Sequence, residues 1–487
     1  MSPSELLKHS PLDATQPSLD ATPHTEAGDV ANNECTTPRQ WVASRFNARA
    51  SDDQGRLIVW NTMSGAISVF EPTQAEVATK LLSRVGFEGE LSSLGKYLLD
   101  RGFIVSRDVD EAKRFRLTFG QQHYRTDLLE LILMASEDCN FRCVYCYEEF
   151  KRGTMRPSVR RGIKKFVLKR AEALRGLHIA WFGGEPLYGW KAIEDLAPFF
   201  LQTTREHELE YRAHMTTNGY LLTPDIADKL LEWDVHDFQI TLDGVREDHD
   251  RKRFGRDGSP TFERIFANLV SLQARHTDFR VTLRTNFDQE NHARLDEYLA
   301  LIGTQFGGDP RFVVALHAIG KWGGPNDANL AVCGVDEQRE ARQQLVQLAR
   351  KRDLNVGNGI KDQSRPGKSV CYAARPYNFL IGADGKVMKC TVVLDKQDNN
   401  IVGRITEEGD LVLNPDHFAL WVDAAWETDA VCKKCYLVPV CQGISCPMIR
   451  INEGRRPCLS TKSALKAELR ETLELTERVA RQVSVPG

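Results

Sequence analysis

Six short apolar segments between residues 129 and 319 alternate with amphipathic ones, and this repeat constrains the fold more than any other feature of the chain. The apolar segments are LELILMAS, LHIAWFGG, YRAHMTTNG, DFQITLDG, FRVTLRTNF and RFVVALHAI. The segments between them, such as SVRRGIKKFVLKRAEAL and TPDIADKLLEWDV, carry apolar residues at helical spacing. Alternating strands and helices predict a parallel sheet. With six repeats we expect an α/β fold, a partial (β/α)6 barrel of the TIM type over residues 125–350.

Three cysteines follow the first predicted strand in the stretch CNFRCVYCYEEF. Cys139, Cys143 and Cys146 stand on one short loop, so their thiolates can surround one soft metal centre. Four cysteines would fill every iron of a [4Fe–4S] cluster, whereas three leave one iron open to a small molecule. A zinc site would need a fourth Cys or His, which the next four residues do not supply. Scattered buried thiols without a metal are the remaining alternative.

The CxxxCxxC spacing of this loop resembles the signature of the radical S-adenosylmethionine (SAM) superfamily. The resemblance implies that the three cysteines hold a [4Fe–4S] cluster whose open iron chelates the amino and carboxylate groups of SAM. It also implies that Tyr145, the aromatic residue just before the third cysteine, lies near the adenine.

A GGEP motif follows the second predicted strand and consists of Gly183, Gly184, Glu185 and a proline. Glycines let the backbone approach a ligand closely. The carboxylate of Glu185 can pair with an ammonium group. In the radical SAM family this motif contacts the amino group of the methionine moiety, so the resemblance assigns that role here.

Polar residues also stand at the ends of the next three predicted strands. They are Thr217, Asn218, Thr241, Asp243, Arg284 and Asn286. The resemblance implies that this set binds the ribose and carboxylate of SAM. A structural ion pair between Asp243 and Arg284 is the alternative. For His249, just after the fourth strand, we expect a role in positioning the loop.

Seven cysteines follow the predicted barrel, within residues 365–460. The stretch CKKCYLVPVCQGISC has the pattern C-x2-C-x5-C-x4-C and resembles the SPASM domain, which binds two auxiliary [4Fe–4S] clusters. The resemblance assigns Cys432, Cys435, Cys441 and Cys458 to an outer cluster and Cys371, Cys390 and Cys446 to an inner one. The family usually has three residues, not four, between the cysteines that correspond to 441 and 446.

Two questions about this array stay open from the sequence. The fourth ligand of the inner cluster is either Cys333, which stands far upstream, or absent, which leaves an open iron. Two structural zinc sites are the alternative to two clusters, because their cysteine spacing overlaps with this one.

The remaining segments complete the predicted organisation. Residues 1–38 are rich in Ser, Thr, Pro, Asp and Ala, which predicts a disordered tail in which Cys35 is a free thiol. Residues 39–115 contain strand-like and then helix-like segments, with a turn at Ser64–Gly65 and a helix N-cap at Thr73. This order resembles the winged-helix-like recognition domain of enzymes that modify ribosomally made peptides. Residues 461–487 predict a C-terminal packing helix.

Composition limits the partners and the compartment. A net charge of −3 gives no electrostatic case for nucleic acid. No apolar run reaches 18 residues, so no membrane span is expected, and the first residues lack the features of a secretory signal. Cysteines grouped in CxxC-like sets within a large chain are typical of metal binding in a reducing cytosol, which predicts a cytoplasmic protein.

The sequence therefore predicts a radical SAM/SPASM oxidoreductase that installs a cross-link or another oxidative modification on a ribosomally made precursor peptide. It would take its electron from a donor such as flavodoxin or ferredoxin. The first alternative is an anaerobic sulfatase maturase that forms formylglycine. In that group an Asp commonly follows the second SPASM cysteine, where this chain has Thr391. The second is a non-catalytic iron–sulfur scaffold that only binds a peptide.

Overall fold

The structure is a computed structural model, and it describes residues 39–357, 365–459 and 461–483. The predicted tail, with Cys35, lies outside the described residues. None of the helices in the described ranges combines the length and the apolar character that crossing a bilayer requires.

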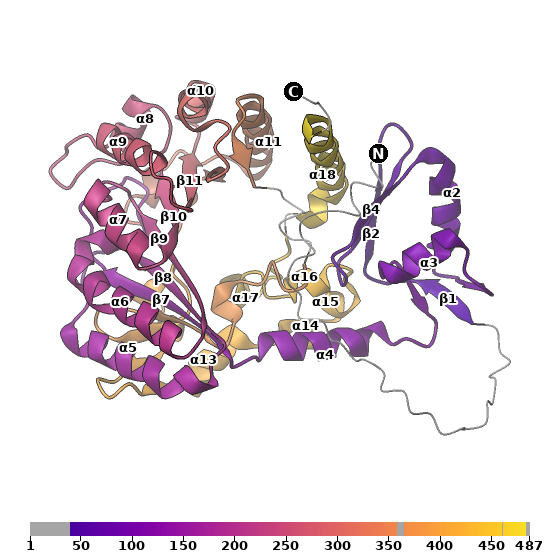
Figure 1. Cartoon of the computed structure of the whole chain (residues 1–487), viewed down its shortest axis with the longest axis horizontal. Coiled ribbons are helices and arrows are strands. Elements are labelled where there is room, and N and C mark those ends of the chain that lie inside the picture. The colour runs from indigo at the N-terminus through magenta and orange to yellow at the C-terminus, as the bar shows by residue number, and fades with distance from the viewer. Residues whose placement is uncertain (1–38, 358–364, 460, 484–487) are drawn as a thin grey trace.

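The six predicted strands lie on the left in Figure 1 and pair in chain order, each parallel to the next. They are β7 (Leu128–Ser136), β8 (Gly176–Gly183), β9 (Glu210–Thr217), β10 (Val235–Thr241), β11 (Arg280–Phe287) and β12 (Phe312–Ala318), followed by the short parallel β13 (Asn355–Val356). Helices connect them: α5 (Pro157–Arg170), α6 (Trp190–Glu206), α7 (Pro224–Glu232), α8 (Arg246–Lys252), α9 (Phe262–Gln273), α10 (Leu295–Phe306) and α11 (Val335–Lys351). The predicted partial α/β barrel is confirmed.

The cysteine-rich region continues the same sheet, which sequence analysis did not predict. β14 (Asn378–Ile381) pairs in parallel with β7, and β15 (Lys386–Met388), β16 (Ile401–Ile405) and β17 (Leu411–Leu413) add antiparallel strands. An ion pair links the cysteine-rich region to the barrel: Arg375 Nη1 lies 2.8 Å from a carboxylate oxygen of Glu130 on β7. Short helices follow: α13 (Pro415–Val422), α14 (Ala425–Thr428), α15 (Ala430–Lys434), α16 (Val438–Cys441) and α17 (Pro447–Glu453). The barrel and the cysteine-rich region therefore share one eleven-stranded sheet.

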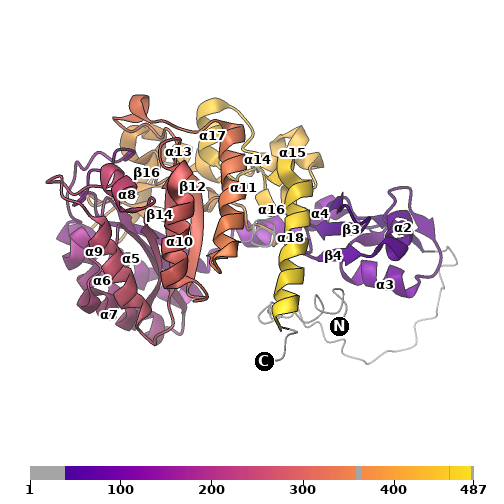
Figure 2. The ribbon, with the colours of Figure 1, turned by 90° about the horizontal axis from the view of Figure 1, so that it is seen from above.

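The N-terminal unit has two small sheets and two helices on the far side of the molecule from the barrel (Figures 1 and 2). One sheet contains β1 (Gln40–Ala43), β5 (Phe87–Glu88) and β6 (Ile104–Ser106), and the other contains β2 (Asn47–Ser51), β3 (Leu57–Asn61) and β4 (Ile67–Phe70). The helices are α2 (Pro72–Leu81) and α3 (Ser93–Asp100). The predicted turn is present, with Gly65 at φ 78° and its N–H donating to Asn61 O.

The predicted N-cap at Thr73 is wrong. Helix α2 begins one residue earlier, at Pro72, and the extended Glu71 precedes it. Proline favours the first helical position because its fixed φ suits a helix and its missing N–H is not needed there.

Two longer helices connect the parts of the chain. α4 (Glu111–His123) runs from the N-terminal unit to the barrel, with Asp110 accepting hydrogen bonds from its first turn. α18 (Thr461–Val483) lies beside β2. Short 3-10 turns lie at Ala171–Ala173, Pro186–Gly189, His292–Arg294, Asp327–Asn329, Tyr372–Ala374, Leu394–Lys396 and Asp398–Asn400.

Candidate active site

The cysteine loop folds over the carboxyl end of the barrel strands. Backbone hydrogen bonds fix it to the end of α8 and the residues just after it: the N–H of Val144 donates to Lys252 O at 2.9 Å and the N–H of Arg142 to Phe254 O at 3.0 Å. From the loop after β12, Asn326 Nδ2 donates to Val144 O at 3.0 Å. Segments that follow β10 and β12 therefore hold the loop in place.

The three thiols of this loop lie in one buried environment. Cys139 is 6 % exposed, and Cys143 and Cys146 are partly buried. Burial, followed by the charge that Cys143 would carry, raises the pKa of Cys146 to about 12, and burial likewise raises the pKa of Cys139. Three such thiols become thiolates only beside a strong positive centre, which an iron–sulfur cluster supplies.

The donor set fits a cluster better than a single ion. Across the described ranges, no three His, Cys, Asp or Glu side chains converge closely enough to hold one metal ion. A cubane cluster requires no such convergence, because each cysteine binds a different iron. The chemistry of the three thiols therefore agrees with the cluster expected from their spacing.

Glu185 of the GGEP motif is completely buried and joins the ends of β8 and β9. Its Oε1 accepts from Thr217 Oγ1 at 2.7 Å, and its Oε2 accepts from the N–H of Asn218 at 2.7 Å. Asn218 Nδ2 in turn donates to Asn140 Oδ1 at 2.8 Å, inside the cysteine loop. A carboxylate has about four acceptor positions, so these bonds leave Glu185 able to accept from an ammonium group as predicted.

Close backbone contacts require glycine at both positions of the motif, which the sequence alone did not predict. A Cβ on Gly183, whose φ is 126°, would lie 2.0 Å from Ser136 O. A Cβ on Gly184 would lie 2.7 Å from Asp138 O. The glycines therefore let the turn after β8 pack directly against the start of the cysteine loop.

A polar cluster joins Tyr145 to the ends of β10 and β11. The Tyr145 hydroxyl donates to Asp243 Oδ2, and the N–H of Asn286 donates to Asp243 Oδ1 at 2.8 Å. Arg253 Nη1 donates to the Tyr145 hydroxyl at 2.7 Å. Burial raises the pKa of Asp243, against the lowering effect of Arg253. The structure thus brings together residues that are far apart in the sequence.

The alternative ion pair between Asp243 and Arg284 is wrong, because Arg284 Nε donates to Asn286 Oδ1 at 2.9 Å instead. His249 is buried between Asp243 and Thr261. Its Nδ1 accepts from the N–H of Asp243 at 3.2 Å, and its Nε2 lies 3.1 Å from the Thr261 hydroxyl. Burial, followed by the charge of Arg253, holds the pKa of His249 well below its usual range. These contacts agree with a neutral, loop-positioning histidine. Thr241 is buried at the end of β10.

Arg253 is a site residue that sequence analysis missed. It is 7 % exposed, and its Nε has no hydrogen-bond partner within the described structure. Its charge acts on Cys143, Tyr145 and Asp243. In the run HDRKR nothing distinguishes Arg253 from the exposed Arg251, so only the fold identifies it.

The four cysteines assigned to the outer cluster line one partly open pocket. Arg450 and Arg456 line it as well, and Arg450 Nη2 lies 3.3 Å from Cys432 Sγ. Positive groups beside thiols favour the thiolate form that binds iron. The extra residue before Cys446 is accommodated by two consecutive left-handed residues, Gln442 and Gly443, at φ 52° and 67°.

The three inner cysteines also lie together. Burial raises the pKa of Cys371 to about 11, with further contributions from the charges of Cys390 and Cys446. Cys333 as their fourth ligand, or an open iron in its place, stays a prediction. The Cys333 thiol lies on the loop before α11, where Glu337, Asp288 and Lys252 are the charged groups that act on it.

Comparison with known proteins agrees with this geometry. Residues 133–302 match the radical SAM superfamily. A cysteine-type anaerobic sulfatase-maturating enzyme of Clostridium novyi (strain NT) is 25 % identical over 341 residues, which cover 64 % of this chain and 86 % of that protein. The radical SAM cyclopropyl synthase TigE of Paramaledivibacter caminithermalis is 26 % identical over 230 residues, covering 42 % of this chain and 47 % of that protein.

A solved structure, native anSMEcpe with bound AdoMet and Cp18Cys peptide, has the same fold. It superposes with a TM-score of 0.52 over 73 % of this chain and 100 % of that chain, at 20 % identity.

Proposed function

Since residues 133–302 of this chain are a radical SAM domain, we propose that the protein is a maturase that abstracts hydrogen from a residue of a ribosomally made precursor peptide and installs a cross-link or other oxidative modification. One observation carries the proposal. Lys396, six residues after Cys390 of the inner group, donates from its Nζ to the carbonyl of Tyr147, the residue after Cys146 of the first group, at 2.6 Å. The segments that carry the two cysteine groups are therefore in direct contact.

The chain's own residues would bind SAM and exclude water. When bound, the first cluster would supply one electron that cleaves SAM into methionine and a 5′-deoxyadenosyl radical. Glu185 offers a buried carboxylate for the SAM amino group, and Arg253 a buried cation for its carboxylate. Burial of the site keeps water from quenching a reactive intermediate. A small electron-transfer protein such as flavodoxin or ferredoxin would supply the electron.

The N-terminal unit supports a peptide substrate. Strand β4 is the last strand of its sheet and pairs only with β3, so an extended peptide can add to its free edge. The similar structure of anSMEcpe contains a bound peptide. Both observations support recognition of an extended chain.

Formylglycine formation on a protein is the second candidate, favoured by the similarity to the Clostridium novyi enzyme. Against it, the residue after Cys390 is Thr391, whose hydroxyl lies 2.7 Å from the Tyr372 hydroxyl. A threonine hydroxyl in a neutral hydrogen bond does not act as the carboxylate base that this reaction commonly uses.

The test is anaerobic reconstitution of the full chain, reduction with dithionite and quantification of 5′-deoxyadenosine from SAM. Synthetic peptides from short reading frames beside the gene, and a cysteine-containing sulfatase peptide, would then be offered as substrates. Loss of two hydrogens from a precursor peptide supports the cross-linking maturase, and conversion of the cysteine to an aldehyde supports the second candidate. No 5′-deoxyadenosine under any reducing condition would mean a non-catalytic scaffold.

Arg253→Met is expected to weaken SAM binding at least about tenfold, because it removes a charge-assisted interaction from a buried site. Arg251→Met is the matched control, since Arg251 lies two residues away with its side chain 56 % exposed. Equilibrium dialysis of SAM against reconstituted protein measures both. SAM affinity unchanged in Arg253→Met would contradict the assignment, and a thermal melt of each variant checks that it is folded.

Deletion of residues 1–110 is expected to abolish binding of the precursor peptide. The physical reason is loss of the free edge of β4, which supplies backbone hydrogen bonds to an extended peptide. Because the deleted residues also pack around Cys432 and Cys435, the iron content is expected to fall toward about 8 per chain, at four irons per cluster, while the first cluster still forms 5′-deoxyadenosine from SAM. Fluorescence anisotropy of a labelled precursor peptide measures the binding, with 5′-deoxyadenosine formation as the folding control. Peptide affinity equal to that of the full chain would refute the recognition role.

A further inference from the structure

The outer cysteine site and the N-terminal unit share a hydrophobic core although hundreds of residues separate them. One face of β2 and β3 packs against the segment between Cys435 and Cys441 and against α18. The buried members are Ala48, Ala50, Ile58, Trp60, Leu437, Val440, Leu469 and Leu473. Cys435 packs against this cluster. A ligand of the predicted outer cluster thus contacts a core to which the N-terminal unit contributes half of the side chains.

A second hydrophobic core also links the N-terminal unit to the outer cysteine site, through another predicted cluster ligand, Cys432. Phe46 of the N-terminal unit, Phe115 and Phe119 of α4, and Trp426 surround Cys432. The rings of Phe115 and Trp426 lie 4.8 Å apart between centroids, in an edge-to-face arrangement. Aromatic pairs of this kind add to the stabilisation from burial alone.

Polar contacts reinforce the connection along the same segment. The Thr62 hydroxyl donates to Tyr436 O, and the Arg45 guanidinium donates to Lys433 O. Both carbonyls lie between Cys432 and Cys441. At the end of β2, Arg470 Nε of α18 donates to Ser51 O at 2.8 Å.

The segment that carries these contacts cannot hold its own shape. Its two helices, α15 and α16, have five and four residues, which is far below the length at which a helix is stable in water. Two things can fix it: the apolar core on one face and ligation of its cysteines on the other. Because binding of a metal centre to cysteines contributes folding free energy, loading of the site and order of the segment are linked.

We propose that the outer cluster has a structural role. Its ligation by Cys432, Cys435, Cys441 and Cys458 fixes the surface on which the N-terminal unit docks. Loading of that cluster then controls the order of β2, β3 and α18. The proposal needs the outer cluster that the cysteine pattern predicts, but no particular substrate or reaction, so it can fail or succeed independently of the proposed function.

The test is hydrogen–deuterium exchange on the full-length, anaerobically reconstituted chain. Cys458→Ala removes one ligand without removing core packing, because Cys458 is exposed and belongs to neither core. We expect exchange in residues 47–61 and in α18 to become at least about tenfold faster, while β8 to β10 stay unchanged. Cys371→Ala, which removes an inner ligand instead, should leave residues 47–61 as protected as in the wild type.

Wild-type protein stripped of iron by a chelator provides a second measurement that requires no substitution. It should show the same loss of protection in residues 47–61. Protection equal to that of the loaded wild type, in either the stripped protein or Cys458→Ala, would overturn the proposal. Equal loss in Cys458→Ala and Cys371→Ala would also overturn it, because the effect would then not belong to the outer site.

Discussion

Replacing Cys139, Cys143 and Cys146 by alanine is expected to lower the iron content from about 12 to about 8 per chain, at four irons per cluster, and to abolish 5′-deoxyadenosine formation. The three thiols, one buried and two partly buried, are the cysteine ligands that this loop offers. Without them no iron is positioned to bind SAM, so the loss of activity should be complete rather than graded. Iron and sulfide analysis after anaerobic reconstitution, together with chromatography of the SAM products, measures both effects.

Cys333→Ala is the matched control for this prediction. Cys333 is as buried as Cys139, and the charged groups that act on its thiol are Glu337, Asp288 and Lys252 rather than another cysteine, so its loss should leave about 12 irons in place. A triple variant that keeps its full iron content would contradict the assignment of the first cluster. About 4 irons with zinc in the wild type would instead mean that the C-terminal array is structural.

The barrel could be predicted because its strands leave a strong trace in the sequence. Parallel strands that are buried on both faces read as nearly continuous apolar runs, and LELILMAS becomes β7 with six consecutive buried residues at its end. The cysteine loop, GGEP and the polar strand ends could be found for a related reason. Carboxyl ends of parallel strands meet at one edge, so residues such as Glu185 and Asn218 come together whenever the strands do.

Strands β14 to β17 could not be predicted in the same way. They have three to five residues each, and a long irregular connection that contains Cys390 separates β15 from β16. Such short strands owe their conformation to pairing with β7 and with one another, which no local pattern records. The sequence showed the cysteine spacing but not that the barrel sheet continues beneath it.

Buried charge was the other feature that the sequence concealed. The run HDRKR looks like a solvated polar stretch, yet it contains Arg253, which reaches Tyr145, and Lys252, which is 2 % exposed. Whether a cation is buried depends on what packs against it, here the cysteine loop and the end of β11. The glycines of GGEP likewise depend on tertiary packing, since Gly183 lies against the carbonyl of Ser136 and Gly184 against that of Asp138.

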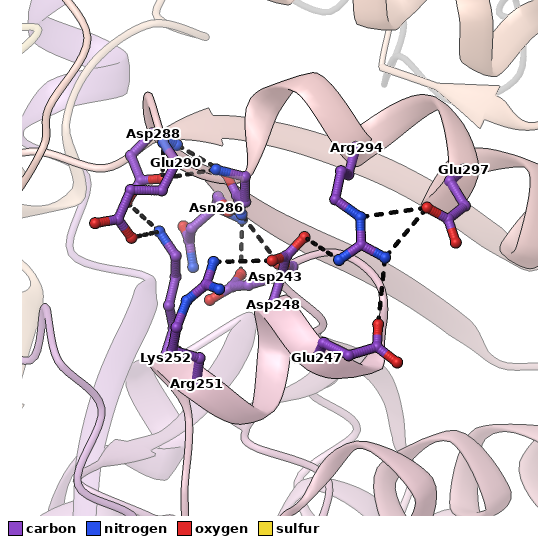
Figure 3. Close-up of polar contacts among 11 residues, drawn as sticks. Asp243, Glu247, Asp248, Arg251, Lys252, Asn286, Asp288, Glu290, Arg294 and Glu297 are labelled. Atoms are coloured by element: carbon purple, nitrogen blue, oxygen red, sulfur yellow. Dashed lines mark hydrogen bonds and ion pairs between the residues drawn. The ribbon is translucent and has the colours of Figure 1, made fainter.

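Lys252→Met is expected to lower the free energy of unfolding by about 3–5 kcal/mol, because it leaves the carboxylate of Asp288 buried without its cation. Lys252 pairs with Asp288, which is 4 % exposed at its side chain, and Lys252 Nζ lies 3.2 Å from Glu290 Oε2 (Figure 3). The other Asp288 oxygen accepts from the N–H groups of Glu290 and Asn291, so the carboxylate cannot turn toward water without breaking the start of the loop. Denaturant unfolding of the metal-free protein measures the loss.

The double variant Lys252→Met/Asp288→Leu is expected to recover most of that stability, since replacing both members of a buried pair by apolar residues is often neutral or stabilising. Arg251→Met should cost no more than about 1 kcal/mol, because the Arg251 side chain is 56 % exposed and the buried Asp248 keeps Arg294, 3.6 Å away, as a second cation. The backbone carbonyl of residue Lys252 accepts from the N–H of Val144, and none of these side-chain substitutions removes it. Folded Lys252→Met protein should therefore still load the first cluster with about four irons, and failure to do so would mean that the ammonium, rather than the backbone, holds the cysteine loop.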